Sequence, residues 1–159
     1  MKSGTPITVY IGLGSNLGER EMNIRRALAE LVQTPQLEVR RISSFLENPA
    51  VGGPEGAPDF INAAVEAQTT LAATALMKRL LEIEQEVGRV RREKWEPRVI
   101  DLDLLLYGNS IISSDTLLVP HPLMHERVFV LRPLAEIAPK AVHPALQMTI
   151  EDLLRNLRT

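Results

Sequence analysis

Hydrophobic and polar positions along the chain follow two periods, and these periods predict its secondary structure. Strand-like runs, with alternating or continuous apolar residues, fall at residues 7–13, 37–45, 60–67 and 100–107. Helix-like stripes, with apolar residues three and four positions apart, fall at residues 19–32 and 71–87. The order strand, helix, strand, strand, helix, strand is that of a ferredoxin-like βαββαβ core.

The rest of the chain adds C-terminal elements to this core. A turn-rich stretch follows residue 107, and further helices are predicted near 133–137 and 150–157. No Pro- or Gly-rich linker divides the 159 residues, so we predict a single domain over 1–159. The predicted class is α+β, with an antiparallel sheet covered by helices.

The segment GLGSNLGER, residues 12–20, links the first strand to the first helix. It fits neither of the glycine-rich phosphate-binding patterns, G-x-G-x-x-G or G-x-x-x-x-G-K-[ST]. We interpret it as a turn in which the glycines relieve backbone crowding and Ser15 or Asn16 caps the helix.

Composition limits the classes of partner. The formal net charge is −2, which gives no reason to expect a nucleic-acid or membrane partner, and no apolar run approaches the length of a membrane span. The chain has no cysteine, which excludes disulfides and thiolate metal sites and fits a cytoplasmic protein. Any cationic site must therefore be local.

Two carboxylates interrupt the most hydrophobic run, RVIDLDLLLYG. On a strand, Asp101 and Asp103 point to the same face with Cα atoms ~6.6 Å apart, while Leu102, Leu104 and Leu106 point to the opposite face. Close carboxylates repel each other, and oxygen ligands suit Mg²⁺. An ordinary solvent-exposed strand face remains the alternative.

A cluster of five cations precedes these aspartates, comprising Arg89, Arg91, Arg92, Lys94 and Arg98. Arginine's planar fork matches phosphate oxygens, although a solvated loop is the usual fate of such a run. Trp95 lies within it and either closes over a ligand or packs back on the domain.

Two further groups suggest ligand contacts. His121, His125 and Arg127 come together in PHPLMHER, without zinc-type spacing, and hydrogen bonding to phosphate is the better interpretation. Phe60 and Asn62 share one strand face, which suits a flat heterocycle with amide-like edges. A half-buried Phe and a capping Asn would be the plain structural alternative.

Taken together, four segments resemble the 6-hydroxymethyl-7,8-dihydropterin pyrophosphokinases of folate biosynthesis. The matching segments are GLGSNLGERE, SSFLENPAVGGPEGAPDFINAAV, EIEQEVGRVRREKWEPRVIDLDLLLYG and VPHPLMHERVFVLRPLAEIAP. The resemblance implies a ferredoxin-like fold and transfer of the β,γ-pyrophosphoryl group of ATP to the pterin hydroxymethyl oxygen, releasing AMP.

The same resemblance assigns roles to individual residues. It implies that two Mg²⁺ ions bind Asp101 and Asp103, and that Arg89 and Arg98 contact phosphate. The implied ATP side comprises Glu84, Arg91, Trp95, Leu104, His121 and Arg127. The implied pterin site comprises Asn48, Pro49, Val51, Phe60, Asn62 and Phe129, with the two rings on either side of the ligand.

Some positions depart from the family's pattern. Phe60 stands where Tyr is common, Leu81 replaces a polar residue, and Leu123 stands where a basic residue is frequent. These departures bear on adenosine contacts. The rival interpretation is a non-catalytic domain that binds nucleotide or RNA through its basic loop. RNA readers of this shape usually stack bases on several aromatics, and aromatics are 4% of this chain, which argues against it. We expect a monomer.

Overall fold

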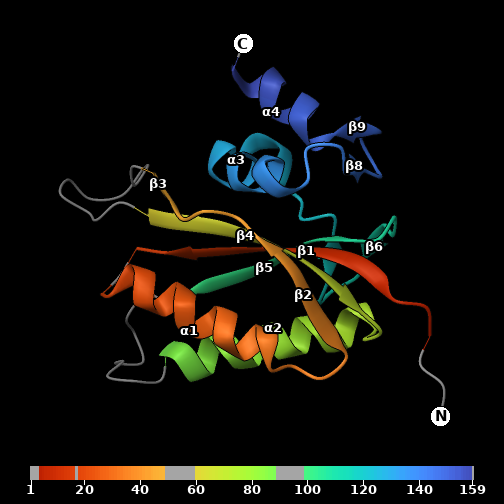
Figure 1. Ribbon diagram of the computed structural model, residues 1–159. Helices are drawn as coiled ribbons and strands as arrows, with labels where there is room; N and C mark the ends of the chain where they lie inside the picture. Colours follow the sequence, from red (N-terminus) through yellow and green to blue (C-terminus); the bar gives the residue numbers. More distant parts are fainter. Residues whose placement is uncertain (1–3, 17, 49–59, 89–98, 159) are drawn as a thin grey trace.

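The fold is a sheet between two layers of helices (Figure 1). The structure is a computed structural model, and it describes residues 4–16, 18–48, 60–88 and 99–158. The sheet runs in the order β2 (Leu37–Ile42), β4 (Phe60–Thr69), β1 (Ile7–Ser15) and β5 (Asp101–Tyr107), and β3 (Leu46–Asn48) also pairs with β4. All of these pairs are antiparallel.

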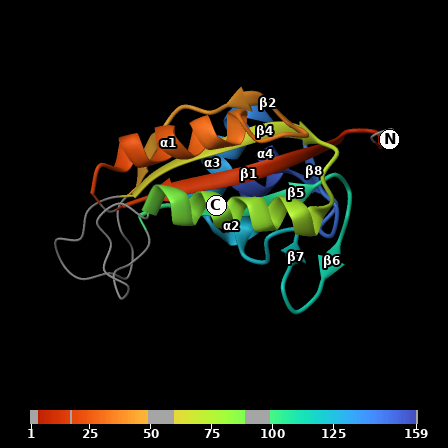
Figure 2. The same ribbon diagram turned by 90° about the horizontal axis from the view of Figure 1, so that it is seen from below.

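The helices cover both faces of this sheet. They are α1 (Arg20–Val32), α2 (Ala73–Gly88), α3 (Val128–Ile137) and α4 (Ile150–Arg158). Figures 1 and 2 show α1 and α2 on one face, and Figure 1 shows α3 and α4 on the other. Because the two strands nearest the centre, β4 and β1, are flanked by β2 and β5, the predicted ferredoxin-like α+β core is confirmed.

Small elements complete the C-terminal part. They are the hairpins β6 (Ile112–Ser113) with β7 (Leu118–Val119) and β8 (Val142–His143) with β9 (Met148–Thr149), and the 3₁₀ helix η1 (Met124–Glu126). Within the described residues, no helix is long and apolar enough to cross a membrane.

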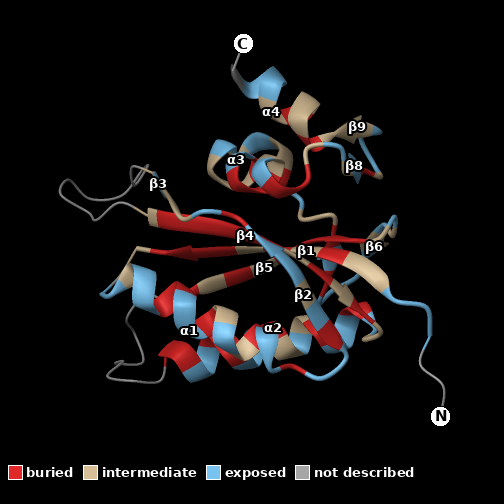
Figure 3. Ribbon diagram, viewed as in Figure 1, coloured by how far each residue is buried: buried red, intermediate tan, exposed pale blue. Residues whose placement is uncertain are grey.

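Side-chain alternation along the central strands divides the apolar residues into two cores (Figure 3). Val9, Ile11 and Leu13 of β1 face α1 and α2, where they join Leu76, Leu80 and Ile83. The second core lies on the other face, where Ala64 and Leu105 contact the side chains of α3 and α4. The apolar stripes of α1, α2 and α3 are thereby buried against the sheet, while α4 packs on α3, and this burial is the main source of the fold's stability.

A β-bulge corrects one prediction about β5. Tyr10 faces Leu106 and Ile11 faces Leu104, so Leu105 is the additional residue on β5. Leu102 and Leu104 point to the α1–α2 core as predicted, but the bulge places Leu106 in the opposite core. The prediction for Leu106 was wrong because an extra residue shifts the two-residue alternation.

The strand predicted over residues 37–45 is interrupted. The backbone N–H of Ser43 donates to the carbonyl of Ala64 over 2.9 Å, while the Ser43 hydroxyl accepts from the N–H of Ala64 over 2.8 Å. A side-chain oxygen thus takes the place of a backbone carbonyl at this point. The result is two separate strands, β2 and β3, both paired with β4.

The predicted side-chain cap of α1 was also wrong. Glu19 is the N-cap residue and makes no side-chain cap hydrogen bond. Ser15 lies within β1, and its hydroxyl donates to the carbonyl of Val99 over 2.6 Å. Asn23 of α1 donates to Ser15 Oγ over 3.2 Å and to the same carbonyl over 3.4 Å. These bonds tie the residue two positions before Asp101 to the end of β1.

Helix α3 begins earlier than the sequence indicates. The presence of Pro133 favoured a short helix starting there, because proline suits a first helical turn. The helix instead begins at Val128 and contains Pro133, which is buried. The extra turn at its beginning carries Phe129 and Val130.

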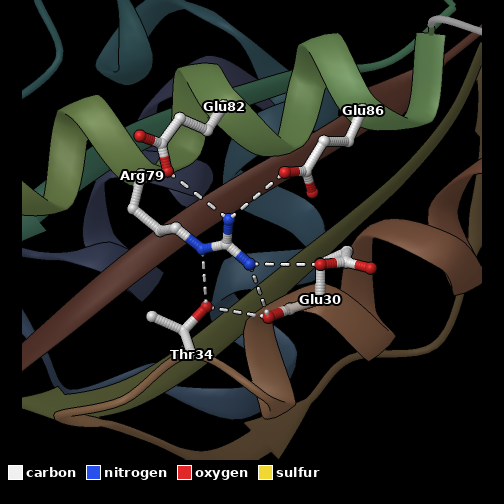
Figure 4. A network of polar contacts seen from close by, with 5 residues as sticks. All are labelled: Glu30, Thr34, Arg79, Glu82 and Glu86. Carbon is white, nitrogen blue, oxygen red and sulfur yellow. Dashed lines mark hydrogen bonds and ion pairs between the residues drawn. The ribbon is translucent and has the colours of Figure 1, made fainter.

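Arg79 joins α2 to α1 (Figure 4). Its Nε donates to Thr34 Oγ1 over 3.0 Å, and its Nη2 lies 3.1 Å from a carboxylate oxygen of Glu30. Its Nη1 lies 3.5 Å from Glu82 and 3.8 Å from Glu86. One partly buried cation therefore neutralises carboxylates of both helices at once.

Candidate active site

The strand register brings the predicted site residues into two rows across the sheet. In the first row, Asp101 of β5 faces Gly14 of β1, which faces Asn62 of β4. In the second row, Asp103 faces Gly12, which faces Ala64. Residues directly opposite in a sheet share a face, so both aspartates project to the side covered by α3.

A cavity of about 420 Å³ lies over these rows. It is lined by Gly12, Leu13, Gly14, Asn48, Phe60, Asn62, Ala63, Asp101, Asp103, Arg127, Phe129 and Val130. Its size lies within the range of small-molecule sites. Both aspartates and four of the residues predicted to bind the pterin therefore line one cavity, together with Arg127.

The two glycines form part of the cavity floor, and sequence reasoning missed this role. A side chain at either position would project to the same face as the aspartates, and the nearest atoms to its Cβ would be Leu105 Cδ1 at 3.4 Å for Gly12 and Asn62 Nδ2 at 2.8 Å for Gly14. The signal was present in the G-x-G spacing within a strand, because residues two apart share a face. Interpreting the segment as a turn concealed it.

Helix α3 supplies the other wall. Arg127, its N-cap residue, has its guanidinium carbon 5.8 Å from the ring centroid of Phe129. At the other end of α3, Arg41 donates to the carbonyl of Ile137 over 3.0 Å. Glu136 accepts from both the N–H and the hydroxyl of Ser44, each over 2.6 Å. These bonds attach α3 to β2 and to Ser44, in the link between β2 and β3.

The ionised form of Glu136 is favoured over the protonated form by the hydrogen bonds that attach α3. Hydrogen bonds from the Ser44 hydroxyl and backbone N–H lower the pKa of Glu136, and burial opposes them weakly. The carboxylate is therefore ionised at neutral pH, the state that accepts both hydrogen bonds.

A second cavity, of about 270 Å³, adjoins the first and shares Asp103 with it. It is lined by Met77, Asp103, Leu104, Ser114, Asp115, Thr116, Leu117, Leu118, His121 and Pro122. Leu104 and His121, both predicted on the ATP side, thus lie here, whereas Arg127 lies in the first cavity. Asp103 borders both spaces.

The pKa of His121 depends on its burial and on two charged neighbours, Asp103 and Arg127. Burial lowers its pKa most, Asp103 opposes that shift, and the Arg127 cation lowers the pKa further. Its Nδ1 accepts a hydrogen bond from the backbone N–H of Leu123 over 3.3 Å, and the backbone N–H of His121 donates to the carbonyl of Leu105 over 3.0 Å. The ring is therefore neutral near pH 7 and presents Nε2–H as a donor.

Glu84 lies on α2, on the side of the helix that contacts β5. It is 7% exposed, and its Oε2 accepts from the backbone N–H of Leu102 over 2.7 Å. This bond fixes the backbone between the two aspartates. The predicted contact of Glu84 with ATP stays a prediction.

The remaining predicted site residues lie outside the described residues. They are Pro49 and Val51 on the pterin side, and Arg89, Arg91, Trp95 and Arg98 on the phosphate side. Of the two departing leucines, Leu81 is exposed on α2 and Leu123 is exposed beside η1. Neither lines the two cavities described above.

The donors that the site offers a metal are two carboxylates. No group of three or more histidine, cysteine or acidic side chains that could hold a metal occurs within the described ranges. Hard divalent cations such as Mg²⁺ are commonly bound by one or two carboxylates plus phosphate oxygens of a substrate. The pair therefore fits Mg²⁺ held jointly with a polyphosphate, and does not fit a self-sufficient zinc site.

Fold and site together define an α+β domain with a cavity lined by two aromatic rings, two carboxamides and a pair of carboxylates. A sequence model of the 7,8-dihydro-6-hydroxymethylpterin-pyrophosphokinase family matches residues 10–139, and the chain belongs to this family. The predicted function, transfer of pyrophosphate from ATP to 6-hydroxymethyl-7,8-dihydropterin in folate biosynthesis, is confirmed by this membership.

Curated relatives carry the name 2-amino-4-hydroxy-6-hydroxymethyldihydropteridine pyrophosphokinase. The Synechocystis protein is 44% identical over 147 residues, covering 92% of this chain and 74% of the relative. The Bacillus subtilis protein is 47% identical over 128 residues, covering 80% and 76%. The Haemophilus influenzae protein is 42% identical over 145 residues, covering 91% and 90%.

Solved structures confirm the fold at much lower identity. The Plasmodium falciparum HPPK-DHPS protein, crystallised with pteroate, superposes with a TM-score of 0.74 and 13% identity. The alignment covers 98% of this chain but 45% of that one. The chain therefore spans less than half of these larger proteins, and the likeness concerns the fold alone.

Proposed function

We propose that this chain catalyses its family's reaction in a Mg²⁺-dependent manner, with Asp101 and Asp103 as the ligands of two ions. The observation that carries the proposal is the register of β5 against β1. It sends both carboxylates to one face and places them opposite Gly12 and Gly14, which have no side chain to fill the space. Ions and phosphate oxygens can therefore occupy the volume between the carboxylates and α3.

The first cavity is the proposed pterin site. Phe60 on β4 and Phe129 on α3 line it from two different elements, and Asn62 lies on its floor. Aromatic rings favour offset stacking on a flat ring system, and a carboxamide pairs with ring nitrogens or carbonyls. This arrangement selects for a bicyclic heterocycle with a polar edge.

The second cavity is the proposed nucleotide side. Because Asp103 borders both spaces, a phosphate chain bound there would reach the hydroxymethyl group through the carboxylate pair. His121 can donate Nε2–H to a phosphate oxygen, and Arg127 supplies a fixed positive charge. The arginines predicted from sequence, Arg89 and Arg98, would add further donors.

The transfer is an in-line displacement. The hydroxymethyl oxygen attacks the β-phosphorus of ATP, and the bond from that phosphorus to the oxygen bridging to the α-phosphorus breaks. AMP leaves with that oxygen, and the hydroxyl proton is released to solvent. When bound, two Mg²⁺ ions would neutralise the developing phosphate charge. Asp101 and Asp103 would hold these ions, and Arg127 and His121 stabilise negative charge, as is typical of phosphoryl-type transfer.

AMP release tests the proposal. The purified chain is incubated with ATP and Mg²⁺, with and without 6-hydroxymethyl-7,8-dihydropterin, and AMP is quantified by chromatography. The expected result is AMP release that requires both the pterin and a divalent cation, and that stops when the cation is chelated. AMP release that is unaffected by chelation would contradict the proposed metal dependence.

We further propose that the chain acts as a cytoplasmic monomer. Light scattering coupled to size-exclusion chromatography should return a mass near 17.7 kDa. A mass near twice that value at micromolar concentration would overturn the monomer, and recovery of activity in a membrane fraction would overturn the location.

A further inference from the structure

Asn62 is held in one orientation by two neighbouring strands. Its Oδ1 accepts a hydrogen bond from Nδ2 of Asn48 on β3 over 2.5 Å. Its Nδ2 lies over β1, only 2.8 Å from the point that a Cβ atom of Gly14 would occupy. The side chain is 8% exposed, so the carboxamide has little space in which to turn.

The hydrogen bond from Asn48 fixes which end of this carboxamide serves the ligand. An Asn side chain offers one acceptor and two donor protons, and its orientation is set by the hydrogen bonds around it. Asn48 engages one of the two lone pairs of Oδ1, whereas both donors on Nδ2 are left for a ligand. Among the described residues, Nδ2 of Asn62 has no partner. The two Nδ2 donors are therefore matched by a ligand edge that carries an acceptor.

Gly14 provides the space for this orientation. A distance of 2.8 Å between a Cβ and an amide nitrogen is shorter than real structures tolerate, so any side chain here would push the carboxamide away. The backbone of Gly14 does not have a positive φ, so conformational freedom does not explain the glycine. The reason for glycine here is the close approach of Asn62.

We propose that Gly14 and Asn48 are positioning residues for the heterocyclic substrate, acting through Asn62 to aim its amide donors at an acceptor on the ring edge. This inference rests on the proposed function, because it assigns the first cavity to the pterin. It extends that function by naming two residues that set substrate affinity without contacting phosphate or metal.

The first test is a double-mutant cycle between Asn48 and Asn62. The variants Asn48→Ala, Asn62→Ala and Asn48→Ala/Asn62→Ala are compared with the unaltered chain for pterin KM, ATP KM and kcat. We expect Asn62→Ala to raise the pterin KM about tenfold and Asn48→Ala to raise it severalfold. The double variant should match Asn62→Ala alone, and the ATP KM should hardly change.

The non-additivity is the decisive outcome. If Asn48 acts through Asn62, its effect vanishes once Asn62 is gone. Effects that multiply in the double variant, or a rise in the ATP KM equal to that in the pterin KM, would overturn the proposal. A merely structural role for Asn48 would lower the thermal midpoint without producing this selective pattern.

The second test uses Gly14→Ala. We expect the added methyl to raise the pterin KM about tenfold, and Gly14→Ala/Asn62→Ala to be no worse than Asn62→Ala alone, because the clashing group has been removed. If Gly14→Ala does not fold, the double variant should still fold with the thermal midpoint of Asn62→Ala. A double variant that remains unfolded, or a Gly14→Ala enzyme with an unchanged pterin KM, would contradict the inference.

Two controls separate this inference from the proposed function. Gly4→Ala makes the same substitution at an exposed residue with nothing within 4 Å of the added carbon, and it should leave all constants unchanged. The unaltered chain must release AMP only in the presence of pterin. Failure there would overturn the proposed function, whereas failure of the cycles in an active enzyme would overturn the positioning roles alone.

Discussion

The two faces of the same strands differ in what they carry. Toward α1 and α2, strands β1, β4 and β5 present a mainly apolar surface that includes Ile11, Val65 and Leu104, with Ser15 as a polar exception at the end of β1. Toward α3, the intervening positions of these strands carry glycine, asparagine and aspartate. The backbone is shared, so the difference lies entirely in alternate side chains.

This contrast separates stability from chemistry. Apolar side chains that are packed against helices stabilise the fold through burial, whereas two like charges side by side on one face of β5, each opposite a glycine, repel each other and favour a bound cation. Functional sites commonly lower stability in this way. Substitutions on the two faces should therefore have opposite effects on activity and on stability.

The largest expected effect comes from Asp103→Asn. Removing one negative charge from the proposed metal site should lower kcat about a thousandfold, equivalent to about 4 kcal/mol of transition-state stabilisation. Steady-state AMP release and thermal unfolding are measured on the same preparation. The thermal midpoint should stay level or rise, because the repulsion with Asp101 is relieved, and pterin binding should be nearly unchanged. Near-normal turnover in Mg²⁺ would remove the proposed role.

The opposite face is tested by Ile11→Ala. Ile11 is fully buried on β1, and its truncation should lower the free energy of unfolding by about 3 kcal/mol through lost burial and a residual cavity. Urea unfolding gives this value, and kcat of the folded fraction should hardly change. Equal losses of stability and kcat at low temperature would show that the two faces are not separable.

A smaller effect is expected at Arg79, which joins α2 to α1. Arg79→Met keeps the apolar stem but leaves Glu30, Glu82 and Glu86 without their shared cation. The free energy of unfolding should fall by about 1 kcal/mol, with unchanged kcat and KM. Arg79→Lys serves as the control and should lie between the two, because it keeps the charge but loses the planar fork. A fully stable Arg79→Met variant would show that the contact contributes nothing.

The smallest effect is the pH dependence of stability that arises from His143, in the layer that contains α3 and α4. His143 is buried, and burial lowers its pKa from 6.5, with the neighbouring His125 adding to the shift. The unfolded chain therefore binds this proton more readily, so stability is full above about pH 6.5 and declines as the pH falls below that value. Thermal midpoints between pH 7.5 and 5.5 measure the decline, and His143→Gln should flatten it. An identical slope in that variant would assign the pH dependence to other groups.

The order of strands and helices along the chain, and the apolar face of each, could be predicted from periodicity alone. Val9, Ile11 and Leu13 alternate without interruption, and the stripe of Leu76, Leu80 and Ile83 repeats at helical spacing. The shared direction of Asp101 and Asp103 followed from the same rule, because the bulge at Leu105 lies after both of them.

Features that depend on pairing between distant strands could not be predicted. Leu106 changes face because of a bulge defined against Tyr10, and Ser15 bonds to a residue 84 positions away instead of capping α1. Gly12 and Gly14 have meaning only through the side chains that face them across the sheet. Local sequence carries no direct record of these contacts, so the cavity floor was missed.

The most direct test of the central claim is a crystal structure of the chain with a non-hydrolysable ATP analogue, Mg²⁺ and the pterin. The account predicts that carboxylate oxygens of Asp101 and Asp103 lie about 2.0–2.1 Å from Mg²⁺ on the face covered by α3, with the phosphates completing the coordination. Phosphates bound without either carboxylate, or ions held elsewhere on the molecule, would contradict it.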